Sequence, residues 1–159
     1  MIMFQIRAEQ FLPIGLNEAW NFFSNPNNLS IITPPEMDFK VLSDINDKEI
    51  FNGMKIDYIV RPIFGIPMHW QTEIYDVKDK CSFTDRQLKG PYKVWEHTHT
   101  FTEMNGGVMM HDVVNYQLPF WFIGNIAHTL IVKNKIENIF VYRKQVLEKI
   151  FINNGKNLN

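Results

Sequence analysis

Two long runs of alternating side chains, joined by a glycine turn, restrict the fold of this chain more than any other feature. The first run covers residues 92–104, the second covers residues 107–118, and Asn105-Gly106-Gly107 separates them. A period of two is typical of strands with one buried face, and Asn-Gly turns accept the positive φ of tight hairpins. The pattern therefore predicts a long antiparallel β-hairpin.

The first strand of this hairpin carries an unusual mixture of side chains on one face. Because successive strand side chains point to opposite sides, one face should hold Lys93, Trp95, His97, His99 and Phe101. Two imidazoles between two aromatic rings are too polar for an ordinary core and too apolar for an ordinary solvated surface. We therefore expect this face to line a partly enclosed cavity.

Polar side chains of the neighbouring strands can join this face. Asp85 and Gln87 alternate onto one face with Phe83, and Asp112 shares a face with Tyr116 on the second strand of the hairpin. If both faces are concave, these side chains and the two histidines form a polar belt inside an aromatic pocket.

The His and Asp residues of this belt are candidates for three roles. His97 and His99 can converge on one metal ion, with Asp85 or Asp112 as a third ligand. An Asp beside a His fixes its tautomer and raises its pKa, which suits general acid–base catalysis. The same pairing also satisfies a buried imidazole by hydrogen bonding. We favour histidines that orient a ligand through hydrogen bonds, and we expect no metal and no cofactor.

The segments before the hairpin predict an α+β chain. A first strand over residues 2–12 should be followed by two short helices, one after Gly15 and one over residues 29–32, which Pro34 ends. Alternating runs separated by turn residues then predict an antiparallel meander. Its candidate strands before the hairpin cover residues 38–42, 48–51, 54–61, 68–76 and 81–88, with Asn52-Gly53 as a turn.

After Pro119 the apolar spacing becomes helical. Apolar side chains recur at i, i+3, i+4 from Val132 to Ile150, which predicts one long helix of about five turns and a frayed tail from about residue 153. Arg143 falls on the apolar stripe, so we expect its guanidinium to face the sheet and pair with an Asp or Glu, or with a ligand carboxylate. A curved sheet of six to seven antiparallel strands around this helix is a helix-grip, and the gap between them tends to be a cavity.

Length and composition indicate one domain over residues 1–159 and exclude several classes of partner. The net charge is −1, from 16 Lys and Arg against 17 Asp and Glu without a basic block, so we expect no nucleic-acid partner. Cys81 is the only cysteine, which fits a reducing compartment. No uninterrupted apolar run long enough for a membrane span and no secretory leader are visible, so we expect a cytoplasmic protein.

Several segments resemble one protein family over nearly the whole length of the chain. They are residues 19–26, 29–34, 65–70 with 73–74, Phe83-Thr84-Asp85-Arg86-Gln87 with Gly90-Pro91-Tyr92, residues 95–101 and residues 112–119. With these segments the chain resembles the START-like (SRPBCC) helix-grip superfamily, and within it an uncharacterised bacterial ligand-binding or polyketide cyclase/dehydrase-like subgroup. Two segments depart from that pattern. The loop at residues 118–124 carries three large aromatic side chains, and Arg143 is the main arginine of the last helix.

The resemblance implies that a small, largely apolar molecule, aromatic or lipid-like, binds between the sheet and the last helix. The expected ligand-binding residues are Trp70, Asp85, Gln87, Trp95, His97, His99, Phe101, Asp112, Tyr116 and Arg143. The alternative is a cyclase or dehydratase in which His97 or His99, set by Asp85 or Asp112, moves protons on a bound carbonyl compound. The sequence leaves the choice between a binding protein and an enzyme open.

Overall fold

The computed structural model describes residues 2–45, 49–62, 65–119 and 126–153. The strands are β1 (Phe4–Leu12), β2 (Lys40–Val41), β3 (Lys55–Val60), β4 (Met68–Lys78), β5 (Ser82–Lys89), β6 (Val94–Met104) and β7 (Gly107–Gln117). The helices are α1 (Leu16–Phe23), the 3₁₀ turns η1 (Pro26–Ser30) and η2 (Pro35–Met37), the long α3 (Ile126–Glu148) and the π-helical turn η3 (Lys149–Asn153). Among the described residues, no helix combines the length and the apolar character needed to cross a membrane.

The strands form one curved antiparallel sheet in the order β1-β7-β6-β5-β4-β3-β2. The predicted hairpin is confirmed as β6 and β7, which pair from Val94↔Gln117 to Met104↔Gly107, and Gly106 turns with a φ of 84°. Register shifts interrupt the pairing of β4 with β5, after Gln71 and after Tyr75. Such irregularities increase the bend of a strand, so they contribute to the curvature of the sheet.

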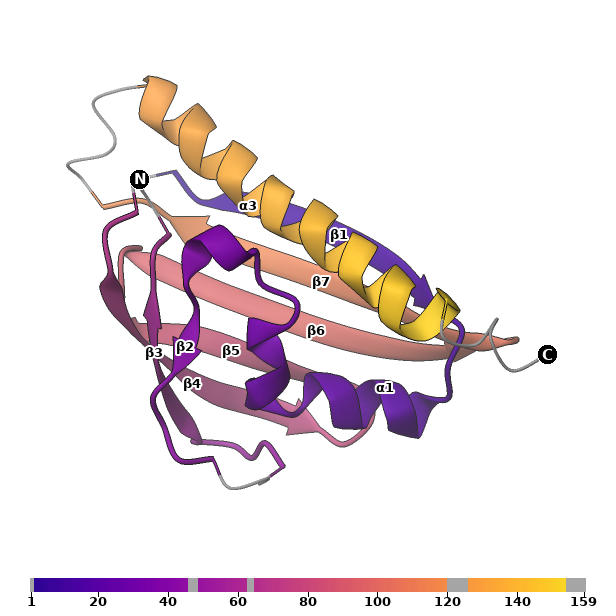
Figure 1. Ribbon diagram of the computed structural model, residues 1–159. Helices are drawn as coiled ribbons and strands as arrows, with labels where there is room; N and C mark the ends of the chain where they lie inside the picture. Colours follow the sequence, from indigo (N-terminus) through magenta and orange to yellow (C-terminus); the bar gives the residue numbers. More distant parts are fainter. Residues whose placement is uncertain (1, 46–48, 63–64, 120–125, 154–159) are drawn as a thin grey trace.

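The long helix covers one face of this sheet. Figure 1 shows α3 lying along β1 and β7, with α1 and the 3₁₀ turns on the same side of the sheet. The predicted apolar stripe is confirmed, because Val132, Ile136 and Leu147 are buried in the two clusters of core side chains. The structure is therefore the predicted α+β helix-grip.

Local chemistry explains where the short elements differ from the prediction. The second helical segment begins at Pro26 rather than at residue 29, because the Asn25 side chain accepts a hydrogen bond from the Asn27 backbone N–H (3.0 Å) and proline starts a helical turn well. Residues 49–51 are not a strand. Here the chain turns instead at Gly53, whose φ is 88°.

The start of β6 also differs from the prediction. Gly90 and Pro91 break the alternation, so the strand begins at Val94 and not at residue 92. Lys93, which was expected beside Trp95 on the inner face, is therefore exposed, and Tyr92 is buried in its place. The three aromatic residues of the 118–124 loop and the tail beyond residue 153 lie outside the described residues.

The attachment of α3 to the sheet can be tested with two leucines of the same helix. Leu147 is fully buried in the core, whereas Leu130 is 55% exposed. Leu147→Ala should lower the free energy of unfolding by about 2–5 kcal/mol, because it removes buried methyl groups and leaves a cavity. Leu130→Ala should change it by less than about 0.5 kcal/mol. Urea unfolding followed by circular dichroism measures both, and equal effects would contradict this packing of α3.

Candidate functional site

Three neighbouring strands bring two histidines and two aspartates together. In the register of the sheet, Asp85 on β5 lies opposite His97 on β6, and His99 on β6 lies opposite Asp112 on β7. Opposite residues in an antiparallel pair point to the same face. The four side chains thus share the face that α3 covers, as the alternation of the sequence predicts.

The carboxylate of Asp112 is the centre of this cluster. Its Oδ1 accepts a hydrogen bond from His97 Nε2 (2.9 Å) and lies 3.5 Å from Arg143 Nη1 of α3. The same oxygen lies 2.8 Å from His99 Nδ1, but the direction of that ring nitrogen does not fit a hydrogen bond. The prediction that Arg143 faces the sheet and pairs with an acid is confirmed.

The charges of the cluster follow from burial and from these pairs. Burial alone would raise the pKa of Asp112, but Arg143 and the two imidazoles outweigh it and hold this pKa well below its ordinary value. Burial, together with the neighbouring His99, lowers the pKa of His97. Burial also opposes a charge on His99, yet the close carboxylates of Asp112 and Asp85 outweigh burial and raise the pKa of His99. Asp112 is therefore a carboxylate, and the pKa values of the two rings shift in opposite directions.

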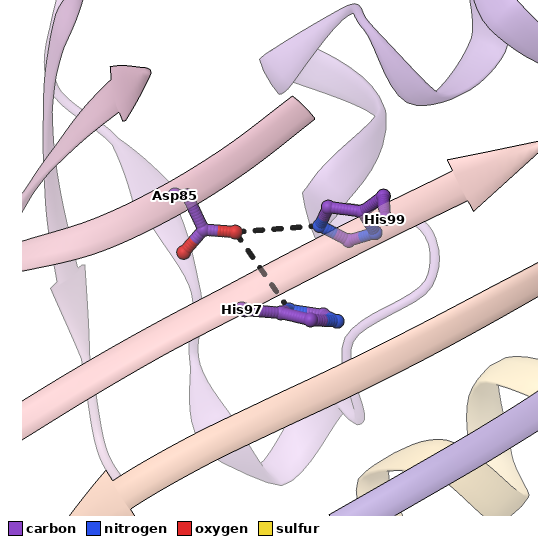
Figure 2. Close-up of side chains that lie close together, drawn as sticks. All are labelled: Asp85, His97 and His99. Atoms are coloured by element: carbon purple, nitrogen blue, oxygen red, sulfur yellow. Dashed lines mark hydrogen bonds and ion pairs between the residues drawn. The ribbon is translucent and has the colours of Figure 1, made fainter. Parts of the chain in front are cut away.

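Asp85 faces both rings from the other side. Its Oδ2 lies 3.3 Å from His99 Nε2 and 3.7 Å from His97 Nδ1, and Figure 2 shows both rings turned toward this oxygen. The ring centroids of His97 and His99 are 3.9 Å apart. One ligand atom from each of the three residues lies within 4.8 Å of the others, so this is a group that can hold a metal ion.

A cavity of about 180 Å³ lies between the sheet and α3. Six of the predicted binding residues line it, namely Trp70, Asp85, Trp95, His97, His99 and Arg143. The two histidines are therefore not sealed from the cavity, although His97 is only 12% exposed.

The other four predicted binding residues lie outside the lining of this cavity. Both ends of the Gln87 amide bond to the backbone of Tyr92, at 2.7 and 3.3 Å, so Gln87 holds the Gly90–Tyr92 loop. Phe101 packs edge-on against Trp20 in the core. Tyr116 is stacked on Phe4. Asp112 contacts the lining residues His97, His99 and Arg143 but does not itself line the cavity.

Several lining residues were not expected from the sequence. They are mainly apolar side chains of α1, the 3₁₀ turns and α3, together with Phe39 just before β2: Phe22, Phe23, Leu29, Met37, Ile136, Ile139 and Phe140. Tyr92 also lines the cavity, because the break at Gly90 and Pro91 turns it inward. The amphipathic pattern of residues 19–23 shows a buried face, but no local signal indicates which part of it borders a cavity rather than the core.

Three buried polar atoms of lining residues have no hydrogen-bond partner within the described part of the chain. They are Trp70 Nε1, His99 Nδ1 and Arg143 Nε. The indole and guanidinium atoms can only donate. Buried donors without an acceptor are rare in proteins, and each costs about 1–3 kcal/mol. Both donors thus remain unpaired among the described residues.

Comparisons with known proteins show the fold. Neither a protein-family model nor a curated protein sequence matches the chain. A START superfamily protein from Mycobacterium smegmatis has 12% identity and a TM-score of 0.68, over 95% of this chain and 97% of the other. The chain has the START-like (SRPBCC) helix-grip fold.

Two further structures place this START-like fold within larger chains. The di-domain ARO/CYC StfQ from the steffimycin biosynthetic pathway has 8% identity and a TM-score of 0.70, over 97% of this chain and 52% of the other. A nucleoside-diphosphate sugar epimerase from Corynebacterium glutamicum has 22% identity and a TM-score of 0.61, over 89% of this chain and 28% of the other. At these identities the likeness concerns the fold.

The protonation of the two rings can be tested by NMR titration of their ring protons. His99 should titrate above about 6.5 and His97 below it. Because folding raises the pKa of His99, its contribution to stability is complete below about pH 6.5 and is lost as the pH rises through the folded pKa. Because folding lowers the pKa of His97, its contribution to stability is complete above about pH 6.5 and is lost as the pH falls through the folded pKa.

Replacing Asp112 tests whether its carboxylate causes the raised pKa of His99. Asp112→Asn should lower the pKa of His99, because the ring loses a carboxylate partner. Titration of both buried rings at one common pKa, or an unchanged pKa of His99 in Asp112→Asn, would contradict this electrostatic account.

Proposed function

We propose that this protein binds a small, largely apolar molecule in the cavity between the sheet and α3, and that the polar cluster orients it. One observation carries the proposal. Buried donors of two lining residues, Trp70 Nε1 and Arg143 Nε, have no acceptor among the described residues. A ligand with acceptor oxygens at two positions would satisfy both.

The walls of the cavity support the apolar part of this proposal. Aromatic rings border it on both sides: Trp70 meets Trp95 at a right angle with centroids 5.3 Å apart, and Phe140 of α3 meets His97 with centroids 5.7 Å apart. Such walls suit a flat ring, because aromatic pairs favour offset and edge-to-face contacts.

The size of the cavity narrows the class of molecule. Cavities of about 150 Å³ hold benzene, and drug-sized ligands fill roughly 300–1,000 Å³. A volume of about 180 Å³ therefore suits one substituted ring rather than a long lipid chain. The START-like fold favours small-molecule binding at a coarse level, and one neighbour of this fold comes from a biosynthetic pathway.

A second function, proton transfer on a bound carbonyl compound, is favoured by the contact of His97 with Asp112. His97 Nε2 donates to Asp112, and the ring borders the cavity. This carboxylate fixes the ring so that Nδ1 can accept a proton, as a cyclase or dehydratase requires. The wild-type protein should then speed the exchange of the α-protons of acetophenone for deuterium, measured by NMR, and His97→Gln should abolish this effect while His111→Gln retains it. Exchange at the rate of the buffer alone would exclude this second function for simple aryl ketones.

The binding proposal can be tested with a matched pair of tryptophan variants. Trp70→Phe keeps an aromatic ring but removes the Nε1 donor, whereas Trp20→Phe makes the same change in the core away from the cavity lining. Native mass spectrometry of the protein as purified should show a bound small molecule. Its occupancy should correspond to an affinity about 3- to 10-fold lower in Trp70→Phe, because a single hydrogen bond contributes about 0.5–1.5 kcal/mol.

The control and the contradicting outcome are defined by the same spectra. Trp20→Phe should retain the bound mass at the occupancy of the wild type. Equal occupancy in all three proteins would remove Trp70 from the site, and a wild-type protein that also fails to bind any of a set of hydroxylated or carboxylated single-ring compounds would contradict the proposal.

A further inference from the structure

Three ligand atoms converge at one point of the cavity wall. One ligand atom from each of Asp85, His97 and His99 lies within 4.8 Å of the other two, and Figure 2 shows the carboxylate on β5 facing the two rings on β6. We propose that Asp85, His97 and His99 bind a divalent transition-metal ion, for which zinc is the best match. The site goes beyond ligand binding and does not depend on it.

The distances fit a tetrahedral metal site better than they fit hydrogen bonds. Ligands about 2.0–2.2 Å from zinc lie about 3.3–3.6 Å from one another at tetrahedral angles. Asp85 Oδ2 is 3.3 Å from His99 Nε2 and 3.7 Å from His97 Nδ1. Hydrogen bonds between charged partners are about 2.7–2.9 Å long. The bond between His97 and Asp112, at 2.9 Å, has that length, whereas both contacts of Asp85 are longer.

In one pair of neutral tautomers, the lone pairs of the two rings and of Asp85 face one another across this gap. A neutral His97 that donates from Nε2 to Asp112 has its lone pair on Nδ1, which faces the carboxylate of Asp85. Likewise, a His99 that keeps its proton on Nδ1, 2.8 Å from Asp112, turns the lone pair of Nε2 toward Asp85. In these tautomers three acceptors surround one point. A cation at that point would remove the repulsion between the three acceptor atoms, because each of them would coordinate the ion.

The surroundings supply the outer shell that such sites need. Metal-binding imidazoles usually donate their other N–H to a carboxylate, which fixes the ring and raises its basicity. Asp112 does this for His97, and Arg143 lies 3.5 Å from Asp112 on its α3 side. With Asp85, Asp112 and Arg143 charged and both rings neutral, the cluster carries −1. A divalent ion brings it to +1, which a bound hydroxide or an anionic ligand oxygen neutralises.

The position of the site leaves one side of the ion open. All three residues line the cavity, so a fourth ligand would come from a water molecule or from the molecule in the cavity. Three protein ligands and one open position are typical of catalytic zinc sites, and two imidazoles favour zinc over magnesium or calcium.

Calorimetric titration of the tag-free, chelator-treated protein with zinc chloride tests the site directly. The wild type should bind one ion, and Asp85→Asn and His97→Gln should weaken binding by more than about 100-fold, since even outer-shell changes cost about 10–100-fold. Asp112→Asn should weaken zinc binding by about 10–100-fold. His69→Gln is the matched control, because His69 also contacts an aspartate, Asp57 at 2.7 Å, but on the exposed surface. It should bind like the wild type.

X-ray absorption of the zinc-loaded wild type keeps the proposal testable if a buried variant fails to fold, which circular dichroism would reveal. The spectrum should show two imidazole ligands and one or two oxygens at about 2.0–2.2 Å. Zinc binding no tighter than in His97→Gln, or a spectrum without two imidazoles, would overturn the metal site. The mass spectra of the tryptophan variants test ligand binding in the cavity independently of the metal site.

Discussion

The buried carboxylate of Asp112 is the interaction on which this site depends. Moving a carboxylate out of water costs several kcal/mol, so it must be paired and hydrogen-bonded. Asp112 lies on β7, the rings that contact it lie on β6, and Arg143 approaches it from α3. One charge thus connects the sheet to the long helix and fixes the face that α3 turns toward the sheet.

The cavity follows from the shape of the same two elements. Core side chains pack α3 closely against the sheet toward one end, where Leu147 is fully buried, and toward the other end, where Val132 and Ile136 are buried. Between these contacts the curved sheet and the helix are separated by rings and by the polar cluster. Trp70 on β4 and Arg143 on α3 both line the cavity, and each has a buried donor without an acceptor among the described residues. The cavity therefore has one wall from the sheet and one from the helix.

Much of this arrangement could be predicted from the sequence, because strand alternation is local. The Asn105-Gly106-Gly107 turn fixes the register of β6 and β7, and that register places His99 opposite Asp112. The helical stripe likewise indicates that Arg143 faces the sheet. Distances between ligand atoms could not be predicted, since they depend on the rotamers of Asp85 and His97.

Other features of the site could not be predicted from local sequence patterns. The role of Gln87 depends on the loop at Gly90, which folds back so that Tyr92 meets its amide. The apolar lining from α1 and the 3₁₀ turns depends on how residues 13–37 cross the sheet, and the sequence has no periodic signal for that path. Phe101 and Tyr116 share the inner face with the histidines, but the packing of Trp20 and Phe4 against them separates both from the cavity.

The central claim is that a small molecule binds in the cavity beside the cluster of Asp85, His97 and His99 and accepts hydrogen bonds from Trp70 and Arg143. The most direct measurement is a high-resolution crystal structure of the protein as purified. The account predicts electron density in the cavity between β4 and α3, with acceptor atoms within about 3.2 Å of Trp70 Nε1 and Arg143 Nε. A cavity closed by protein side chains, with both donors turned to acceptors of the chain itself, would contradict it.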